Sequence, residues 1–482
     1  MNYRLIFNTM GKVLIVTAVL LIIPMLVGLI YSELIVAWAF LTTALVSLVV
    51  GLILVLTCKP KTNVMFAKEG LIIVAFAWIA VSLIGAIPFT LSGEIPSYVD
   101  AVFEMVSGFT TTGASILKDV EIISHGVLFW RSFSHWIGGM GVLVFVMAIT
   151  PKATDRSIHI MRAEMPGHSV DKLVPKANET AKILYIIYIV MTAVMVILLL
   201  CGGMTVFESL VHAFGTAGTG GFGIKSDSLG GYSAYVQWVV AIGMLMFGIN
   251  FNMYYLLLLR KFKSIFKSTE LKTYILIFIG AVVIVCFNIY PKCANFEEAL
   301  RTSIFQCSSI MTTTGFSTTD FNLWNSAAKA VLIILVFIGG CAGSTAGGLK
   351  VSRVVILLKK LGNEIKRVLH PRSANIVKFE GKKLDESTIS GVQSYFTIYI
   401  VMFVALFLLI SMDTTYGFET DFTAVAVCFN NVGPGFGAVG PMSNFAGYSI
   451  FGKIVLSFAM LLGRLEIYPL LLALSPNTWI KK

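Results

Sequence analysis

Four short strings carry the residue types in this chain that are best suited to chemistry. They carry hydroxyl or amide side chains and each ends in glycine. Their residues are Thr110, Thr111, Thr112 and Gly113; Thr216, Ala217 and Gly218; Thr312, Thr313, Thr314 and Gly315; and Asn430, Asn431, Val432 and Gly433. Oxygen ligands without a ring of carboxylates suit a large monovalent cation better than Ca²⁺ or Mg²⁺. Because glycine permits backbone angles that aim a carbonyl group, we expect carbonyl oxygens to bind such a cation and hydroxyl groups to be secondary.

A glycine-rich string lies inside a later apolar run. It comprises Gly339, Gly340, Cys341, Ala342, Gly343, Ser344, Thr345, Ala346, Gly347 and Gly348, and Leu349 and Lys350 follow it. A phosphate-binding loop is excluded, because the lysine does not directly follow the glycine. Each glycine costs a helix up to about 1 kcal/mol relative to alanine. Two interpretations stay open: close packing of helices, or an unwound loop within the membrane.

Four further polar residues, Arg464, Glu466, Arg131 and His135, lie in or beside apolar runs. Arg464 is well inside the last run, where a charge is costly and therefore suggests a function, although snorkelling to the membrane surface is the alternative. Glu466 lies only two residues after Arg464, so the two side chains cannot share one face of a helix. Arg131 and His135 share a face and are flanked by tryptophans, so we interpret them as interfacial anchors rather than a proton relay.

The composition indicates the class of protein in which these strings are placed. Of 482 residues, 57% are hydrophobic and only 13% are charged, whereas soluble chains carry about 25% charged residues. The apolar runs are long and continuous, which indicates transmembrane helices rather than a barrel. The net charge of +11 comes from lysines and arginines in every second connecting segment, the pattern of cytoplasmic loops rather than of nucleic-acid binding. None of the seven cysteines forms a Cys-x-x-Cys pair, so we expect buried thiols, not disulfides or zinc.

The apolar runs repeat a pattern four times. Each unit has a span, an apolar segment too short to cross the membrane, one of the four glycine-terminated strings described above, and a second span. The predicted units are 71–91, 101–109 and 127–149; 183–201, 206–214 and 235–259; 274–290, 296–311 and 329–358; and 392–412, 422–429 and 449–474. A pair of spans at 13–30 and 34–57 precedes them.

The predicted fold is therefore an all-α polytopic membrane protein. It has four span–pore helix–span repeats around one central pore and an N-terminal pair of spans, making about ten transmembrane helices and four re-entrant pore helices. The predicted divisions are 1–58 for the pair, then 59–150, 151–259, 260–360 and 361–482 for the repeats. Thr205 with Glu208, and Asn295 with Glu298, resemble helix-capping pairs. The negative C-terminal ends of these short helices would then point toward the bilayer centre and favour a cation there.

These units and strings resemble the Trk/Ktr/HKT superfamily of potassium transporters, and most closely its bacterial TrkH/TrkG type, which also has the N-terminal pair of spans. The resemblance covers essentially the whole chain. It implies that one glycine in each string shapes a potassium selectivity filter. In plant relatives a serine at the first of these positions accompanies sodium selectivity, so Gly113 favours potassium. The resemblance also implies that the glycine-rich string obstructs the pore as a gate, with Lys350 and Arg464 as its basic residues.

The function implied by this resemblance is potassium uptake through a selective, gated pore in the bacterial inner membrane, with both termini in the cytoplasm and K⁺ as the transported ion. It further implies a homodimer in membrane lipid and a TrkA-like cytosolic ring that binds nucleotide. The chain has no Rossmann glycine fingerprint and no expected organic cofactor, so nucleotide control must come from that partner. A sodium- or proton-coupled symporter is the alternative, which parallel repeats and scarce acidic residues in mid-span disfavour. A membrane enzyme is a distant alternative, because the six histidines are scattered and do not form a catalytic cluster in the sequence.

Overall fold

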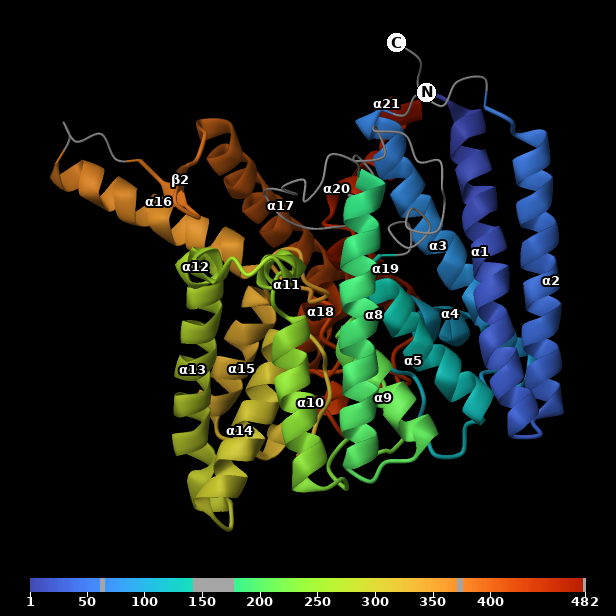
Figure 1. Ribbon diagram of the computed structural model, residues 1–482, viewed down its shortest axis with the longest axis horizontal. Helices are drawn as coiled ribbons and strands as arrows, with labels where there is room; N and C mark the ends of the chain where they lie inside the picture. Colours follow the sequence, from blue (N-terminus) through green and yellow to red (C-terminus); the bar gives the residue numbers. More distant parts are fainter. Residues whose placement is uncertain (61–65, 142–176, 371–375, 480–482) are drawn as a thin grey trace.

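The computed structural model describes residues 1–60, 66–141, 177–370 and 376–479. Long helices run side by side, and the N and C termini lie at the same end of the molecule (Figure 1). The first two helices, α1 (Tyr3–Ile30) and α2 (Leu34–Thr57), form an antiparallel hairpin that packs on α3 (Ala67–Leu91) and α5 (His125–Gly139). Most of the predicted basic linker between the first two units falls at 142–176, outside the described residues.

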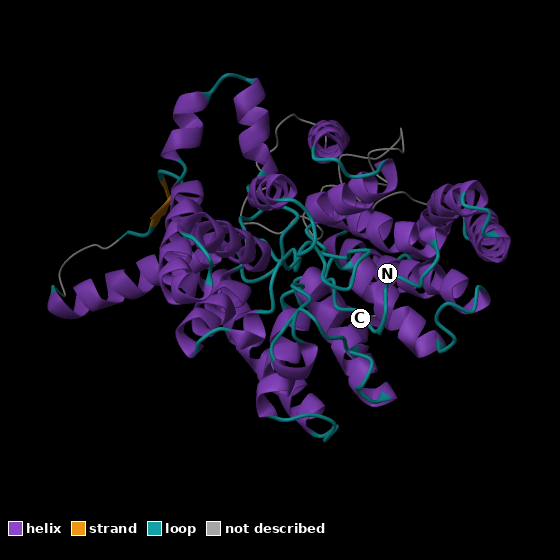
Figure 2. Ribbon diagram, turned by 90° about the horizontal axis from the view of Figure 1, so that it is seen from below, coloured by secondary structure: helices purple, strands orange, loops and turns teal. Residues whose placement is uncertain are grey.

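Four units follow the hairpin, each with a long helix, a short helix and a second helical part. The long helices are α3 (Ala67–Leu91), α8 (Ala177–Cys201), α13 (Thr269–Ile289) and α17 (Glu386–Ser411). The short helices are α4 (Tyr98–Phe109), α9 (Val206–Gly218), α14 (Phe296–Met311) and α18 (Phe418–Phe429). The second parts are α5 (His125–Gly139), α10 (Ala234–Phe247) with α11 (Phe251–Leu258), α15 (Ser326–Ile338) with α16 (Val351–Leu369), and α19 (Ile450–Arg464) with α20 (Tyr468–Leu474). Seen from the end opposite the termini, helices surround a centre filled by loops (Figure 2).

The prediction of continuous second spans is wrong in the second and fourth units, whereas the third is interrupted at the glycine-rich string, as the unwound-loop interpretation expects. The chain bends by 91° between α10 and α11, and α15 and α16 are separated by the glycine-rich string. Between α19 and α20 the helix breaks at Glu466 and Ile467, which both adopt positive φ angles. Within the described residues, six helices are therefore long and apolar enough to cross a membrane, or seven if the bent pair counts as one span. The expected total of about ten assumed uninterrupted second spans.

The expected start signals of two short helices are confirmed. At α9, the Thr205 hydroxyl oxygen accepts a hydrogen bond from the Glu208 backbone N–H (3.2 Å), and the Glu208 carboxylate accepts one from the Thr205 N–H (2.9 Å). At α14, the Asn295 side chain accepts from the Glu298 N–H (2.8 Å). These caps satisfy N–H groups that have no partner within the helix, and thereby define where each short helix begins its descent.

A small β-hairpin departs from the all-α prediction. Strands β1 (Lys378–Phe379) and β2 (Lys382–Lys383) pair in antiparallel register, and Glu380 and Gly381 form the turn with positive φ angles. Strands of two residues are too short to show an alternating pattern in the sequence. The hairpin follows α16 and positions Glu380 against the start of α13. In the part of the chain that the structure describes, the remaining helical elements are α12 (Phe262–Lys267), α21 (Pro476–Trp479), and three turns of 3₁₀ helix at Tyr290–Lys292, Phe321–Leu323 and Gly437–Val439.

Candidate functional site

The chain leaves each short helix with the same backbone conformation in all four units. One residue adopts a left-handed conformation, and two residues later a glycine has a positive φ. The left-handed residues are Thr111, Thr219, Thr313 and Asn431, with φ of 55°, 53°, 55° and 57°. The glycines are Gly113, Gly221, Gly315 and Gly433, with φ of 82°, 78°, 87° and 101°. Such angles are readily adopted by glycine and strained for other residues, so these four glycines are structurally equivalent.

The prediction that Gly218 is the second-unit counterpart of Gly113 is wrong, and Gly221 takes that place. Helix α9 continues through Gly218, beyond the expected end at residue 214, so Thr216, Ala217 and Gly218 form its last turn. A Cβ on Gly218 would clash with the backbone of His135. A signal was present in the sequence, because the order Thr-x-Gly-Phe occurs both at 219–222 and at 313–316.

The four glycines form a closed ring with the residues that precede them. A Cβ added to any of them would lie closer than 3.0 Å to the carbonyl oxygen of the residue just before the glycine of the next unit. The pairs, in order, are Gly113 with Gly220, Gly221 with Thr314, Gly315 with Val432, and Gly433 with Thr112. We call these eight residues the glycine ring. Since the order returns to its start, the four units surround one axis.

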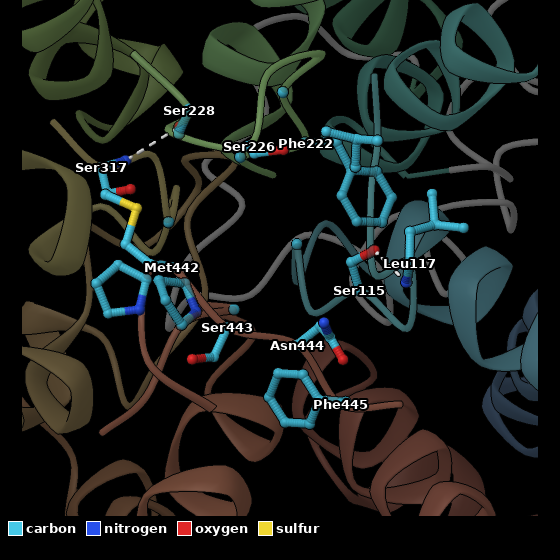
Figure 3. A pocket seen from close by; sticks show the side chains of 18 of the residues that line it. Ser115, Leu117, Phe222, Ser226, Ser228, Ser317, Met442, Ser443, Asn444 and Phe445 are labelled. Atoms are coloured by element: carbon cyan, nitrogen blue, oxygen red, sulfur yellow. Dashed lines mark hydrogen bonds between the residues drawn. The ribbon is translucent and has the colours of Figure 1, made fainter. Parts of the chain in front are cut away.

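A cavity opens on one side of the glycine ring and is lined by all four glycines. Figure 3 shows side chains from all four units around it, among them Ser115, Phe222, Ser317 and Asn444. Backbone hydrogen bonds connect cavity-lining segments of different units. For example, the Phe445 N–H of the fourth unit donates to the Ser115 carbonyl of the first (2.8 Å). We call this space the ring cavity. Its position makes it an approach to the axis.

Most threonine hydroxyl groups of the predicted strings are engaged within the protein. Those of Thr110, Thr216 and Thr312 donate to backbone carbonyls four residues earlier. The Thr112 hydroxyl accepts from the Asn431 side chain (3.0 Å). Hydroxyl groups that already serve these bonds are less available to an ion, which agrees with the expectation that backbone oxygens are the main ligands.

The glycine-rich string forms an irregular loop between α15 and α16, as one of the two interpretations expects. Gly339, Gly343 and Gly348 have positive φ angles, which a continuous helix does not allow. We call residues 339–350 the glycine-rich loop. It touches the glycine-ring segments directly, because the Gly347 N–H donates to the Thr313 hydroxyl (2.6 Å) and a Cβ on Gly347 would clash with the Asn430 carbonyl oxygen. The loop therefore contacts the ring segments at Thr313 and Asn430, neither of which lines the ring cavity.

Arg464 and Lys350 both bind this loop. The Arg464 guanidinium donates to the carbonyl oxygens of Thr345 (2.8 Å) and Gly139 (2.6 Å), and so connects the loop to the end of α5. The buried Lys350 ammonium group donates to the carbonyl oxygen of Ala346. The inward contacts of Arg464 favour the functional interpretation over snorkelling. Its neighbour Glu466 instead pairs with Arg353 (2.6 Å).

Glu270 also holds the glycine-rich loop, which the sequence did not indicate. This carboxylate lies in the first turn of α13 and is 5% exposed. It accepts from the Ala342 N–H (2.7 Å) and from the backbone of Ser352 at the start of α16. The Glu270 N–H in turn donates to Glu380 in the β-hairpin turn (2.9 Å). An acidic residue in a first helical turn is a common favourable feature, so nothing marked this one as a loop contact.

The interpretation of Arg131 and His135 as interfacial anchors is wrong, because both are buried beside the glycine ring. Arg131 pairs with Glu104 (2.7 Å). The His135 Nδ1–H donates to the Gly108 carbonyl (2.7 Å), and its Nε2 accepts from the Phe222 N–H (3.3 Å), which assigns the neutral form of the ring. Four carboxylates are also buried among the described residues, those of Glu69, Glu104, Glu270 and Asp421. Three of them lie in first helical turns rather than in mid-span, and Glu104 lies in the short helix α4.

The sequence and the fold of this chain are similar to those of known transport proteins. Residues 37–480 match the TrkH family, described as a cation transport protein. The chain is 35% identical to the Trk system potassium uptake protein TrkH of Salmonella typhimurium, over 99% of this chain and 100% of the relative. It is 32% identical to TrkG of Escherichia coli, over 99% of both chains. The crystal structure of the potassium transporter TrkH from Vibrio parahaemolyticus superposes with a TM-score of 0.89 at 30% identity, over the whole of both chains.

Proposed function

The chain belongs to the TrkH family of potassium uptake transporters, and from this premise we propose that it conducts K⁺ through a selective pore along the axis of its four units. It is a membrane transport protein and not an enzyme. The observation that carries the proposal is the closed glycine ring, in which four segments of equal backbone conformation meet, each with a carbonyl oxygen against the glycine of a neighbouring unit. Backbone carbonyl groups arranged in this way replace the hydration shell of a potassium ion.

The selectivity filter of the proposal comprises Thr110–Gly113, Thr312–Gly315 and Asn430–Gly433, with Gly218–Gly221 as the corrected segment of the second unit. The four short helices end at these segments. Their C-terminal ends carry partial negative charge, which stabilises a cation at the axis. The full architecture of four span–pore helix–span repeats is part of this proposal, and the fold match to a potassium transporter supports it.

The glycine-rich loop is the proposed gate. It contacts Thr313 of the third unit, the Asn430 backbone of the fourth, and Gly139 of the first through Arg464. The Cys341 N–H donates to the Gly248 carbonyl (3.0 Å) of the second. Contact with all four units supports a position across the axis. Lys350 and Arg464 would add positive charge to this barrier, which disfavours passage of a cation until the loop moves.

The remaining expectations concern orientation and partners. We propose an inner-membrane protein with both termini in the cytoplasm, since basic residues are concentrated in and beside α12 and α16, including Lys261, Lys263, Lys359 and Lys360. Figure 1 shows these two helices toward the end that carries the termini. The similar proteins are named as members of a Trk system, which supports a TrkA-like nucleotide-binding ring docked at this end. A homodimer is proposed on the family premise.

Ion flux into lipid vesicles that contain only this protein tests the proposed function. We expect uptake of K⁺ and Rb⁺ to exceed uptake of Na⁺ by at least tenfold at equal concentration, because the four carbonyl-lined segments match the larger ions. Vesicles without protein provide the control. Equal fluxes of Na⁺ and K⁺ would contradict a potassium-selective filter.

The role of Glu270 in holding the gate gives a separate prediction. Glu270→Ala leaves the N–H groups of Ala342 and Ser352 without an acceptor, and a buried N–H group without an acceptor costs about 1–3 kcal/mol. The loop should therefore loosen, and basal K⁺ flux into vesicles should rise severalfold. Glu69→Ala is the matched control, since Glu69 is also 5% exposed and also lies in a first helical turn, but it bonds to Phe66. An unchanged flux in Glu270→Ala would show that the contact does not restrain the gate.

A further inference from the structure

A buried carboxylate supports the first segment of the glycine ring from behind. Glu104 lies in α4, nine residues before Gly113, and its side chain is fully buried. Its oxygens accept hydrogen bonds from the Ser115 hydroxyl (2.9 Å) and from the Ile116 N–H (2.9 Å). The carboxylate thereby fixes the second and third residues after Gly113, where this segment leaves the ring and enters the wall of the ring cavity.

The partner of this carboxylate is a buried arginine that lines the ring cavity. Arg131 is 1% exposed and donates to Glu104 from both Nε (2.8 Å) and Nη2 (2.7 Å). Its guanidinium carbon lies 4.1 Å from the centre of the Phe222 ring, and Phe222 directly follows Gly221. Figure 3 shows Ser115 and Phe222 on the same side of the cavity. The pair therefore joins the ring segments of the first and second units.

The third and fourth units are supported at the same place by neutral groups. In the third unit, Gln306 holds the same position as Glu104, and its amide donates to the Thr318 hydroxyl (3.3 Å), three residues after Gly315. In the fourth unit, the Thr423 hydroxyl accepts from the Phe436 N–H (3.0 Å), three residues after Gly433. In the second unit, the position equivalent to Glu104 is His212, and the support comes from neutral His135. Among these supports, only that of the first unit uses charged groups.

We propose that Glu104 and Arg131 form a positioning pair that determines how readily a monovalent cation enters the glycine ring. The carboxylate has two roles: it holds the segment after Gly113, and it neutralises a guanidinium group that borders the ring cavity. Buried charges are weakly screened, and removing one partner of a buried pair leaves the other charge uncompensated. Arg131 without its carboxylate would therefore repel the arriving cation. This inference rests on the proposed potassium pore.

Glu104→Gln removes the negative charge of the side chain but keeps its shape. Glutamine also keeps a carbonyl oxygen that can accept the hydrogen bond from the Ile116 N–H. In vesicle flux measurements, the KM for K⁺ should rise at least tenfold, with a smaller change in Vmax. In the double variant Glu104→Gln with Arg131→Gln, the KM should return to within threefold of the parent value, because no net buried charge remains. Arg131→Gln alone should not raise the KM, since it removes the positive group.

Glu297→Gln is the matched control, because it breaks the exposed Arg301–Glu297 pair of α14 (3.3 Å) and should leave the KM unchanged. A double variant with a KM as high as that of Glu104→Gln, or an unchanged KM in Glu104→Gln, would overturn the inference. If Glu104→Gln does not yield folded protein, an Arg131→Gln variant with a tenfold raised KM would overturn it equally. Absence of K⁺-selective flux in the parent protein would instead contradict the proposed function, so the two failures are distinguishable.

Discussion

Gly221→Ser should reduce the preference for K⁺ over Na⁺ at least tenfold. Gly221 has a φ of 78°, and a Cβ there would lie closer than 3.0 Å to the Thr314 carbonyl oxygen. Left-handed backbone costs a residue with a side chain about 1–2 kcal/mol, and the steric conflict is with backbone, which cannot rotate away. The segment must shift, and with it the carbonyl groups of two adjacent units. A tenfold change in selectivity corresponds to about 1.4 kcal/mol, which is within the range of this strain.

The matched control for this prediction is Gly203→Ser. Gly203 has a φ of 85°, so its backbone strain is similar, but nothing lies within 4 Å of an added Cβ. We expect this variant to lose some thermal stability and to keep its ion preference. Uptake of K⁺, Rb⁺ and Na⁺ in parallel vesicle samples measures both variants. Equal selectivity in Gly221→Ser and the parent would show that the ring segment of the second unit does not select the ion.

Gly113→Ser should have a similar effect, for the same geometric reason. A Cβ on Gly113 would clash with the Gly220 carbonyl oxygen, so the disturbance again crosses from one unit to the next. The family resemblance implied a different reason for this substitution, a serine at this position in sodium-selective plant relatives. The structure adds a physical basis, because any side chain at this site displaces the neighbouring carbonyl group.

Local patterns predicted the parts of the fold that depend on local chemistry. Helix α14 runs from Phe296 to Met311, the range expected from its apolar run, and α2 ends at Thr57 as expected. The Asn295 cap and the five glycines of the glycine-rich string also signalled correctly where helices start and stop. In each case the deciding interactions lie within a few residues of one another, so they are visible in a short stretch of sequence.

The errors arose where the deciding contact lies far away in the chain. Helix α9 runs through Gly218 and places Gly221 against the Thr314 carbonyl oxygen of another unit; the shared Thr-x-Gly-Phe order marks the segment, but the helix end depends on that distant contact. Arg131 looks like an anchor between two tryptophans until Glu104, 27 residues earlier, is placed beside it. Glu270 and Ala342 are separated by 72 residues. Burial of charge depends on such partners, and sequence spacing alone does not reveal them.

Deletion of residues 342–347 should raise K⁺ flux at least tenfold in vesicles that lack any partner protein. The deletion removes the Gly347 N–H that bonds to Thr313, the Thr345 carbonyl that accepts from Arg464, and the Ala342 N–H that bonds to Glu270. These contacts hold the glycine-rich loop against the glycine ring. If the loop is the gate, as proposed, its deletion removes the backbone that obstructs the axis and releases Arg464 from the Thr345 contact.

Arg464→Met tests the same gate without changing the chain length. Methionine retains an unbranched apolar side chain but donates no hydrogen bonds to Thr345 or Gly139. We expect a smaller rise in flux than the deletion produces, because the bonds of Glu270 and Thr313 to the loop remain. Arg301→Met is the control, since Arg301 forms only a surface pair with Glu297 among the described contacts. If the deletion left K⁺ flux unchanged while the protein stayed folded and selective, the loop would be a packing element and the gate would lie elsewhere. A rise in flux with retained selectivity would instead show that the two functions are physically separate. The glycine ring would then select the ion, and the glycine-rich loop would control whether ions pass.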